Sequence, residues 1–309
     1  MKILIVGADD VVTNLSATPF LGQWASDAGN KIDMLISVEQ IPFFITNPDI
    51  TKIFRVNGHF CNRWWGSLIY RANILKALMA MRQENFDCII SFSPVSINRY
   101  RLWKLLLGVK HAGYFRDNNF VTSYLNKTEN VSYPDSEKAE NLNASLKLYP
   151  DLQSATVMVR RYCISLTSSN IGIIINSASS VNWTSVQWAS LIRKLSSRGR
   201  VFLISAENNS VSGNEDKTLM AEAQSLCSDG VVTMVVVAKT ADFIAMISLC
   251  SGLISADSDA VWVAASMRVP VIYPDPYAVK DIPPGCKRVS CPNAEKVFNA
   301  FVSNTDSTS

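Results

Sequence analysis

The sequence predicts an α/β protein built from two Rossmann-like lobes. Short apolar runs rich in β-branched residues alternate with longer segments of helical period, and this alternation starts afresh in the second half of the chain. The 309 residues also exceed what one hydrophobic core commonly supports. We therefore expect an N-terminal lobe at residues 1–150 and a C-terminal lobe at residues 151–309, each built on a parallel sheet.

Strands and helices are expected to alternate through both lobes. In the first lobe we predict strands at 3–6, 32–37, 52–56, 88–92 and 110–115, and helices at 14–28, 67–83 and 98–107. In the second lobe we predict strands at 171–176, 201–205, 232–236, 252–255 and 271–273, and helices at 152–166, 184–197, 218–227, 241–250 and 260–267. The polar segment 117–149 is expected to be an irregular connection, and the tail 303–309 is expected to fray.

Composition excludes several classes of protein. Hydrophobic residues make up 48% of the chain, but no apolar run reaches the roughly 20 residues that a membrane-spanning helix needs. The seven cysteines are scattered without a CxxC pair, which predicts reduced thiols and no metal site. A net charge of +3 without a basic stripe argues against nucleic acid as a partner. The apolar start is too short for a secretory segment, so we expect a cytoplasmic location.

Two carboxylates, Asp9 and Asp10, directly follow the first predicted strand. The carboxyl ends of parallel strands are where α/β enzymes place their reactive groups. Either acid could instead cap the amino end of the next helix, because a short carboxylate there accepts a backbone N–H bond. Both interpretations stay open on sequence alone.

Residues 10–17, Asp-Val-Val-Thr-Asn-Leu-Ser-Ala, resemble a segment of the bacterial lipopolysaccharide heptosyltransferases, glycosyltransferase family 9. That family has Gly-Asp-Val-(Val/Leu)-His-Thr-Leu-Pro-Ala after an apolar strand, and the segments 47–50, 86–90 and 108–114 continue the likeness in order. The resemblance implies a GT-B-type fold, in which the two Rossmann-like lobes face a central cleft, with an acceptor-binding N-terminal lobe and a nucleotide-sugar-binding C-terminal lobe. It identifies Asp10 as the general base, with Thr13 in place of the family histidine.

The resemblance also implies donor contacts in the second lobe. The small-residue loop 177–180 takes the place of the family's phosphate-binding turn, so Ser177 and Ser179 would hold the donor diphosphate. Glu207, which follows a predicted strand, would bond the donor ribose. Each of these three residues could also be an ordinary polar loop residue.

One cation that the family uses is missing. The family lysine that balances the charge of the diphosphate is Val181 here, close before the retained Trp183. Either a cation such as Arg160 or Arg161 takes its place, or the donor chemistry is weakened.

The segment 254–272 matches the family's strand, turn, helix and strand around Asp-Ser-Gly-Pro-Met-His-Leu-Ala-Ala. Asp257 and Ser258 are retained where a helix N-terminus would favour phosphate. Asp259 replaces the glycine and Trp262 replaces the histidine. Asp257-Ser258-Asp259 also spells the metal-binding Asp-x-Asp of another glycosyltransferase fold, but the surrounding order is that of the metal-free family.

The implied activity is an inverting, metal-independent transfer of a heptose or other hexose-type sugar from a nucleotide-sugar donor, with no further cofactor. The acceptor would be the lipopolysaccharide core or another cell-surface glycolipid or oligosaccharide. Two alternatives stay open, a non-catalytic glycan- or nucleotide-binding protein of the same fold and a nucleotide-sugar epimerase. The aromatic and basic residues at 59–66 suit either peripheral contact with the inner face of the cytoplasmic membrane or the protein core.

Overall fold

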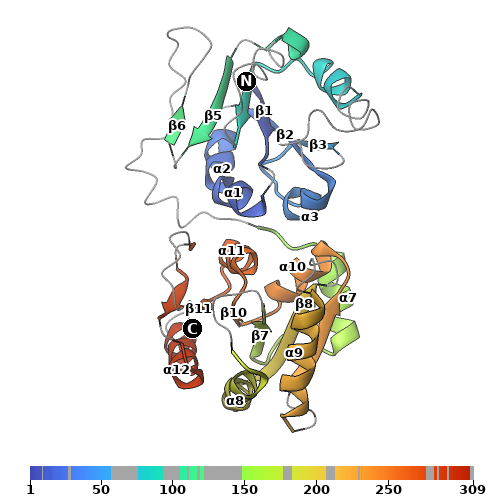
Figure 1. The fold of residues 1–309 in the computed structure, drawn as a ribbon. Coiled ribbons are helices and arrows are strands. Elements are labelled where there is room, and N and C mark those ends of the chain that lie inside the picture. Colours follow the sequence, from blue (N-terminus) through green and yellow to red (C-terminus); the bar gives the residue numbers. More distant parts are fainter. Residues whose placement is uncertain are drawn as a thin grey trace. The chain divides into compact units, whose positions relative to one another are not determined.

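The structure is a computed structural model that describes residues 1–8, 10–26, 29–56, 76–92, 105–109, 111–116, 119–121, 148–176, 183–206, 213–228, 230, 232–275, 282–283, 285–290 and 292–306. Internal contacts divide the chain into two compact lobes, Met1–Lys147 and Leu148–Ser309. The sequence-based boundary was placed after residue 150. Each lobe contains a largely parallel sheet with helices packed against it (Figure 1), which confirms the predicted α/β class.

The N-terminal lobe contains a six-stranded sheet of order β3-β2-β1-β4-β5-β6. Strand β1 is central, and all neighbouring strands pair in parallel except the last pair. The strands are β1 (Lys2–Val6), β2 (Lys31–Ser37), β3 (Lys52–Val56), β4 (Cys88–Ser91), β5 (His111–Arg116) and β6 (Asn119–Val121). The chain adds strands on one side of β1 and then on the other, so the order reverses between β1 and β4. In open α/β sheets, ligands commonly bind at the carboxyl edge beside such a reversal.

The helix predicted at 14–28 is wrong as a single element. The structure has α1 (Val11–Ser16) and α2 (Thr18–Ser26) instead. Proline has no N–H group, so Pro19 cannot donate to the carbonyl of Leu15 as a continuing helix would require. The Thr18 hydroxyl donates to that carbonyl in its place, with 2.7 Å between the oxygens.

Other differences in this lobe involve short elements. The segment 117–149 was expected to be irregular but contains β6, which pairs antiparallel with β5. A strand of three residues is too short to show alternation. The short helices η1 (Val38–Gln40) and α3 (Ile41–Phe44) were not predicted either. Within the helices predicted at 67–83 and 98–107, the described residues 76–82 and 105–107 are helical.

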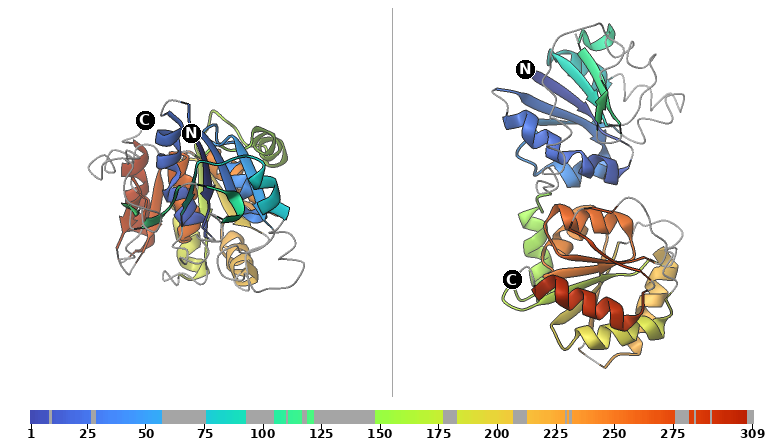
Figure 2. Two further views of the ribbon diagram at one scale, coloured as in Figure 1. Left: turned by 90° about the horizontal axis from the view of Figure 1, so that it is seen from above. Right: turned by 90° about the vertical axis from the view of Figure 1, so that its left-hand side faces the viewer.

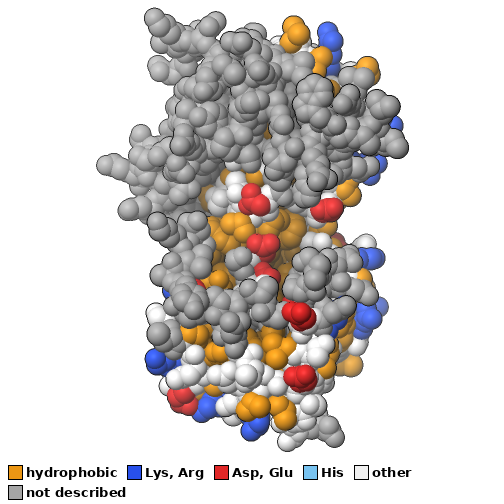
Figure 3. Space-filling model, viewed as in Figure 1, with side chains coloured by type: hydrophobic (Ala, Val, Ile, Leu, Met, Phe, Trp, Pro, Cys, Tyr) orange, Lys and Arg blue, Asp and Glu red, His pale blue; other side chains and the backbone are white. Residues whose placement is uncertain are grey.

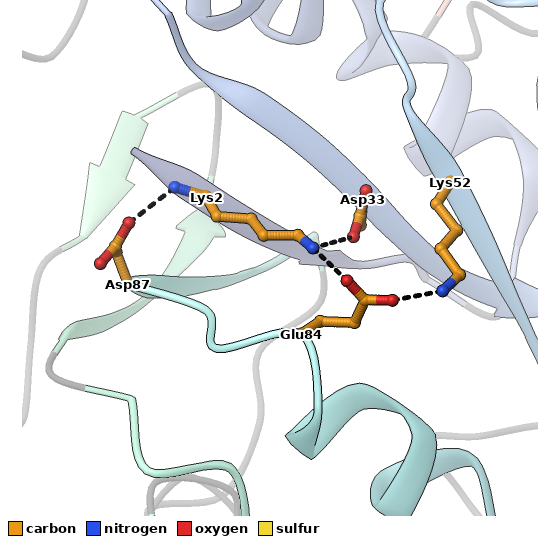
Figure 4. Close-up of polar contacts among 5 residues, drawn as sticks. All are labelled: Lys2, Asp33, Lys52, Glu84 and Asp87. Carbon is orange, nitrogen blue, oxygen red and sulfur yellow. Dashed lines mark hydrogen bonds and ion pairs between the residues drawn. The ribbon is translucent and has the colours of Figure 1, made fainter.

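Charged side chains connect the strands at the amino edge of this sheet (Figure 4). The Lys2 ammonium pairs with Glu84 and lies 3.4 Å from Asp33 Oδ2, and Glu84 also pairs with Lys52. The backbone N–H of Lys2 donates to Asp87 at 2.7 Å. Burial raises the pKa of the Asp33 carboxyl, whereas hydrogen bonds from the two lysines lower the pKa of Glu84 to about 2. The network ties the starts of β1, β2 and β3 to the turn before β4.

We predict that Glu84→Gln destabilises the protein in a pH-dependent way. The pKa of Glu84 in the folded state lies below its ordinary value of 4.5, so its contribution is complete above that value and is lost as the pH falls through about 2. The urea midpoint of the variant should lie below that of the wild type at pH 7, and the two midpoints should converge toward pH 2. Glu222→Gln serves as the control, because Glu222 is exposed and forms no ion pair with a described residue. An equal difference in midpoint at pH 7 and pH 2 would contradict the assignment.

The C-terminal lobe contains a second six-stranded sheet, of order β12-β11-β10-β7-β8-β9, in which every pair is parallel. Here the order reverses between β7 and β10. The strands are β7 (Asn170–Ile174), β8 (Arg200–Ala206), β9 (Val232–Val237), β10 (Gly252–Ser255), β11 (Val271–Pro274) and β12 (Lys287–Val289). The helices are α7 (Leu152–Tyr162), α8 (Ser185–Leu195), α9 (Gly213–Ser225), α10 (Thr240–Ser248), α11 (Ser258–Ser266) and α12 (Ala294–Asp306).

A helix occupies residues 303–306, where the sequence predicted a frayed segment. Residues 303–306 belong to α12, a helix that was not predicted, so the prediction of a frayed tail is wrong for them. Phe301 of α12 is buried in the same core as Trp188 of α8, and Thr305 Oγ1 donates to the Phe301 carbonyl at 3.0 Å. The two helices lie side by side on one face of the sheet (Figure 2, right, dark red and yellow). Their shared core holds the last turns of α12 in place.

Charges of both signs are scattered over the described residues on the face drawn in Figure 3, with no broad basic field among them. Within the described ranges, no helix combines the length and the apolar character needed to cross a membrane.

Candidate functional site

Asp10 follows β1 at the carboxyl edge of the first sheet, beside the reversal of strand order. Its backbone is extended and its exposed carboxylate caps α1, with Oδ1 accepting the Thr13 N–H at 2.6 Å. The capping interpretation of Asp10 is thus confirmed. The other carboxylate oxygen, Oδ2, makes no hydrogen bond to any residue that the structure describes. Capping and proton transfer are compatible in one side chain, because they use different oxygens.

A buried amide behind Asp10 holds the loop that precedes it. Asn14, which is fully buried, accepts the Ala8 N–H at 2.6 Å and donates from Nδ2 to the Ala8 carbonyl at 2.9 Å. Asn14 Nδ2 also donates to Gln40, whose own amide donates to the Ala8 carbonyl at 3.3 Å. Sequence reasoning missed both amides. The available signal was an asparagine four residues after Asp10, on the side of α1 that faces the sheet.

Glycine is required at position 7 for this arrangement. A Cβ atom there would lie 2.6 Å from Ile36 Cγ2 and 3.1 Å from the Asn14 side-chain oxygen. Any larger residue would push the loop away from β2 or displace the Asn14 amide. Gly7 instead continues the pairing of β1, with its N–H donating to the Leu35 carbonyl at 2.9 Å.

The second sheet places a matching pair at its own reversal, where Asn176 follows β7 and Asp257 follows β10. Asp257 caps α11, with Oδ1 accepting the Ala260 N–H at 3.0 Å and Oδ2 accepting Asn176 Nδ2 at 3.3 Å. The buried Ser255 hydroxyl accepts the Asp257 N–H at 3.0 Å. Asp257 and Ser258 therefore stand at a helix N-terminus as predicted. Unpaired N–H groups of a first helical turn favour an anion. Asn176 was not among the predicted site residues.

Several predicted site residues lie outside the described residues. They are Ser177, Ser179 and Glu207, the expected ligands of the donor phosphates and ribose. Asp9, Val181 and the aromatic segment 59–66 also fall there.

The two arginines that could have replaced the missing lysine lie at the opposite edge of the second sheet from Asp257. Arg160 and Arg161 lie in the last turn of α7. The carbonyl that ends this helix, Cys163 O, accepts a hydrogen bond of 2.8 Å from Arg200, the first residue of β8. The end of α7 thus lies at the amino edge of the sheet, whereas Asp257 lies at the carboxyl edge. This separation removes Arg160 and Arg161 as partners of a diphosphate at α11.

The two tryptophans near the donor loop differ in role from Trp262. Trp183 is buried and its ring packs against Trp188, with 4.8 Å between the ring centroids. It is therefore a core residue beside the first turn of α8. Trp262 lies on α11, is only partly buried and stands one turn after Ser258. Its ring can stack on a ligand and its indole N–H can donate, but it carries no charge.

The described residues contain no group of three or more His, Cys, Asp or Glu side chains arranged to hold a metal ion. In the Asp-x-Asp stretch, both carboxylate oxygens of Asp257 already accept hydrogen bonds from the protein. Asp257 is thus used for holding α11, and Asp259 is exposed in the first turn of the helix.

Known proteins resemble this chain in fold, and the resemblance is found by comparing structures. No protein-family model and no curated protein matches the chain. A glycosyltransferase family 9 structure from Veillonella parvula is similar with a TM-score of 0.71 at 12% identity, covering 99% of this chain and 97% of that one. E. coli heptosyltransferase WaaC, solved with ADP-2-deoxy-2-fluoro heptose, is similar with a TM-score of 0.67 at 14% identity, over 100% of both chains. The fold is that of these glycosyltransferases.

A UDP-GlcNAc 2-epimerase from Neisseria meningitidis, bound to UDP-GlcNAc, is also similar, with a lower TM-score of 0.52 at 12% identity. It covers 99% of this chain and 92% of that one. These likenesses confirm the GT-B-type fold that the sequence resemblance implied. At such identities they establish the fold alone, so the activity has to be argued from the residues.

We predict that Asp257→Ala lowers the free energy of unfolding by about 0.5–2 kcal/mol, because the first turn of α11 loses its cap. Asp257→Asn should recover most of this loss, since asparagine caps a helix as well as aspartate does. Urea denaturation of both variants measures the difference. Asp259→Asn is the matched control, because it removes a charge from the same turn and leaves the cap intact. Wild-type stability of Asp257→Ala would rule out the capping role.

Proposed function

We propose that the protein is an inverting glycosyltransferase that uses a nucleotide-diphosphate sugar as donor and Asp10 as general base. The observation that carries this proposal is the position of Asp10. Its carboxylate is exposed at the carboxyl edge of the first sheet, beside the reversal of strand order, and its Oδ2 accepts no hydrogen bond from the described residues. The full-length likeness to glycosyltransferase structures supports the same reaction class.

In the proposed reaction, an acceptor hydroxyl approaches Asp10 and transfers its proton to Oδ2. The hydroxyl oxygen forms a bond to the anomeric carbon of the donor while the bond from that carbon to the diphosphate breaks on the opposite face. The configuration at the anomeric carbon is thereby inverted, and the nucleoside diphosphate leaves with the electron pair. The cap bond from Thr13 holds Oδ1 throughout.

The donor site is proposed at the carboxyl edge of the second sheet. The first turn of α11, with Ser258, would face the diphosphate, together with Ser177 and Ser179, and Glu207 would bond the ribose. Asp259 brings a negative charge to this turn, and Val181 supplies no positive one. The charge of the leaving group would therefore be stabilised mainly by uncharged N–H and O–H donors and without a metal ion.

The proposal extends to the substrates and their location. The donor sugar would be a heptose or another hexose-type sugar, and the acceptor the lipopolysaccharide core or another cell-surface glycolipid or oligosaccharide. Such an acceptor is consistent with a cytoplasmic protein that touches the inner face of the membrane.

Asp10→Asn separates the two roles of Asp10. Asparagine still caps α1 but cannot take a proton, so we expect unchanged stability and a kcat lower by about 10²–10⁴-fold. Asp10→Ala should lose activity similarly and also about 1 kcal/mol of stability. Glu39→Gln, which neutralises another exposed carboxylate of the same lobe, is the control and should retain activity. Transfer at the wild-type rate by Asp10→Asn would exclude this residue as the base.

A panel of nucleotide sugars tests the donor class. A donor at 100 times its Kd should stabilise the folded protein by about 2.7 kcal/mol, seen as a higher melting temperature. Nucleotide sugars that share the diphosphate should act alike, and free sugars should have no effect. The panel contradicts the donor class if no nucleotide sugar raises the melting temperature.

The replacements at Val181 and Trp262 favour a second candidate, a glycan- or nucleotide-binding protein of the same fold that has lost turnover. A nucleotide sugar that binds and yields no product with any acceptor would indicate this function. Conversion of the donor in the absence of acceptor would instead indicate an epimerase.

A further inference from the structure

We propose that Asn14, supported by Gln40, is the positioning residue that sets the place of the Asp10 carboxylate. Neither side chain has a path to substrate, because both are buried behind the loop, with 0% and 5% of their surface exposed. This inference rests on the proposed function, in which Asp10 takes the proton.

The chain is held on both sides of residue 9 by two interlocked sets of hydrogen bonds. On one side, Asn14 accepts the N–H and donates to the carbonyl of Ala8. On the other side, the Asp10 carboxylate accepts the N–H of Thr13, the residue directly before Asn14. Helix α1 is therefore bonded to the loop after β1 through Asn14, and the first turn of the same helix is bonded to the Asp10 carboxylate.

The choice of an amide at position 14 has a physical reason. Ala8 is buried, so its N–H and carbonyl need partners inside the protein. Only a side chain with both a donor and an acceptor can serve the two groups of one residue. Gln40, from the element after β2, completes the arrangement by accepting from Asn14 and donating to the Ala8 carbonyl. Hydrogen bonds therefore fix the position of the loop relative to both α1 and the segment that follows β2.

An apolar side chain of similar size at position 14 would leave the Ala8 N–H unsatisfied and the Ala8 carbonyl with the Gln40 amide as its donor. The loop would then no longer be bonded to α1 through residue 14. Asp10 would then still be present but would no longer be held at one distance from the carboxyl edge of the sheet. A displacement of about 1 Å of a catalytic group can cost about 10²-fold in rate.

The test compares Asn14→Leu and Gln40→Leu with the control Thr18→Val. The hydroxyl of the buried Thr18 donates to the Leu15 carbonyl, and Thr18 is not among the described residues that hydrogen-bond Ala8. All three variants lose buried hydrogen bonds in the same region, but only the first two lose contacts to the loop. For each variant we would measure kcat and KM well below its melting temperature, and the hydrogen exchange of the Thr13 amide by NMR.

We expect kcat of Asn14→Leu to fall by about 10²-fold with KM nearly unchanged, and exchange at Thr13 to accelerate. Gln40→Leu should show smaller changes in the same direction. Thr18→Val should keep kcat and Thr13 exchange, whatever stability it loses. If Asn14→Leu does not fold, Gln40→Leu decides by the same two readouts.

Wild-type exchange at Thr13 in a folded Asn14→Leu or Gln40→Leu protein would overturn the inference. Equal losses of kcat in the loop variants and in Thr18→Val would also overturn it, because general destabilisation would then explain the effect. The exchange measurement needs no turnover. If the wild type transfers no sugar from any donor, the proposed function fails, while the exchange of Thr13 still decides whether Asn14 holds the Asp10 cap.

Discussion

Both candidate sites depend on one constraint. In each lobe, the first strand lies between two later strands and pairs in parallel with both of them. In a parallel sheet every strand delivers the chain to the same edge, and the connection must return before the next strand begins. Because β1 lies between β2 and β4, and β7 between β8 and β10, the strand order reverses beside both. The loops that follow these strands carry Asp10 in one lobe and Asn176 in the other.

In both lobes, an aspartate caps the helix that begins at this edge of the sheet. Asp10 and Asp257 each cap a helix through the N–H three residues later, and each region is secured by an asparagine amide. The two aspartates differ in how many of their carboxylate oxygens accept hydrogen bonds from described residues. Both oxygens of Asp257 are engaged, so this side chain holds α11 in place. Asp10 uses Oδ1 as the cap, Asn14 anchors the loop, and Oδ2 accepts no hydrogen bond from the part of the chain that the structure describes, which is why we propose it as the proton acceptor.

The ion-pair network and the proposed general base lie at opposite edges of the N-terminal sheet. The ion pairs of Lys2 with Asp33 and Glu84 tie the strands together at their amino ends, where no substrate group is proposed. The carboxyl edge relies on neutral amides, Asn14 and Gln40, behind an exposed acid. Both of these anchors are uncharged, so neither adds a full charge beside Asp10.

The sequence by itself determined the α/β class, most strands and helices, and the place of Asp10, because apolar runs and helical period depend only on neighbouring residues. Strands β3 and β10 match their predicted residues completely. The roles of Ser177, Ser179 and Glu207 came from resemblance alone. The break between α1 and α2 has a local cause in Pro19, which the helical period did not reveal. Only the tertiary structure decided the pairing of β6 with β5 and the contact of Asn14 with Gln40, which lies 26 residues away. Such contacts exist only after β1 and β2 have paired, and no local pattern encodes the distance between them.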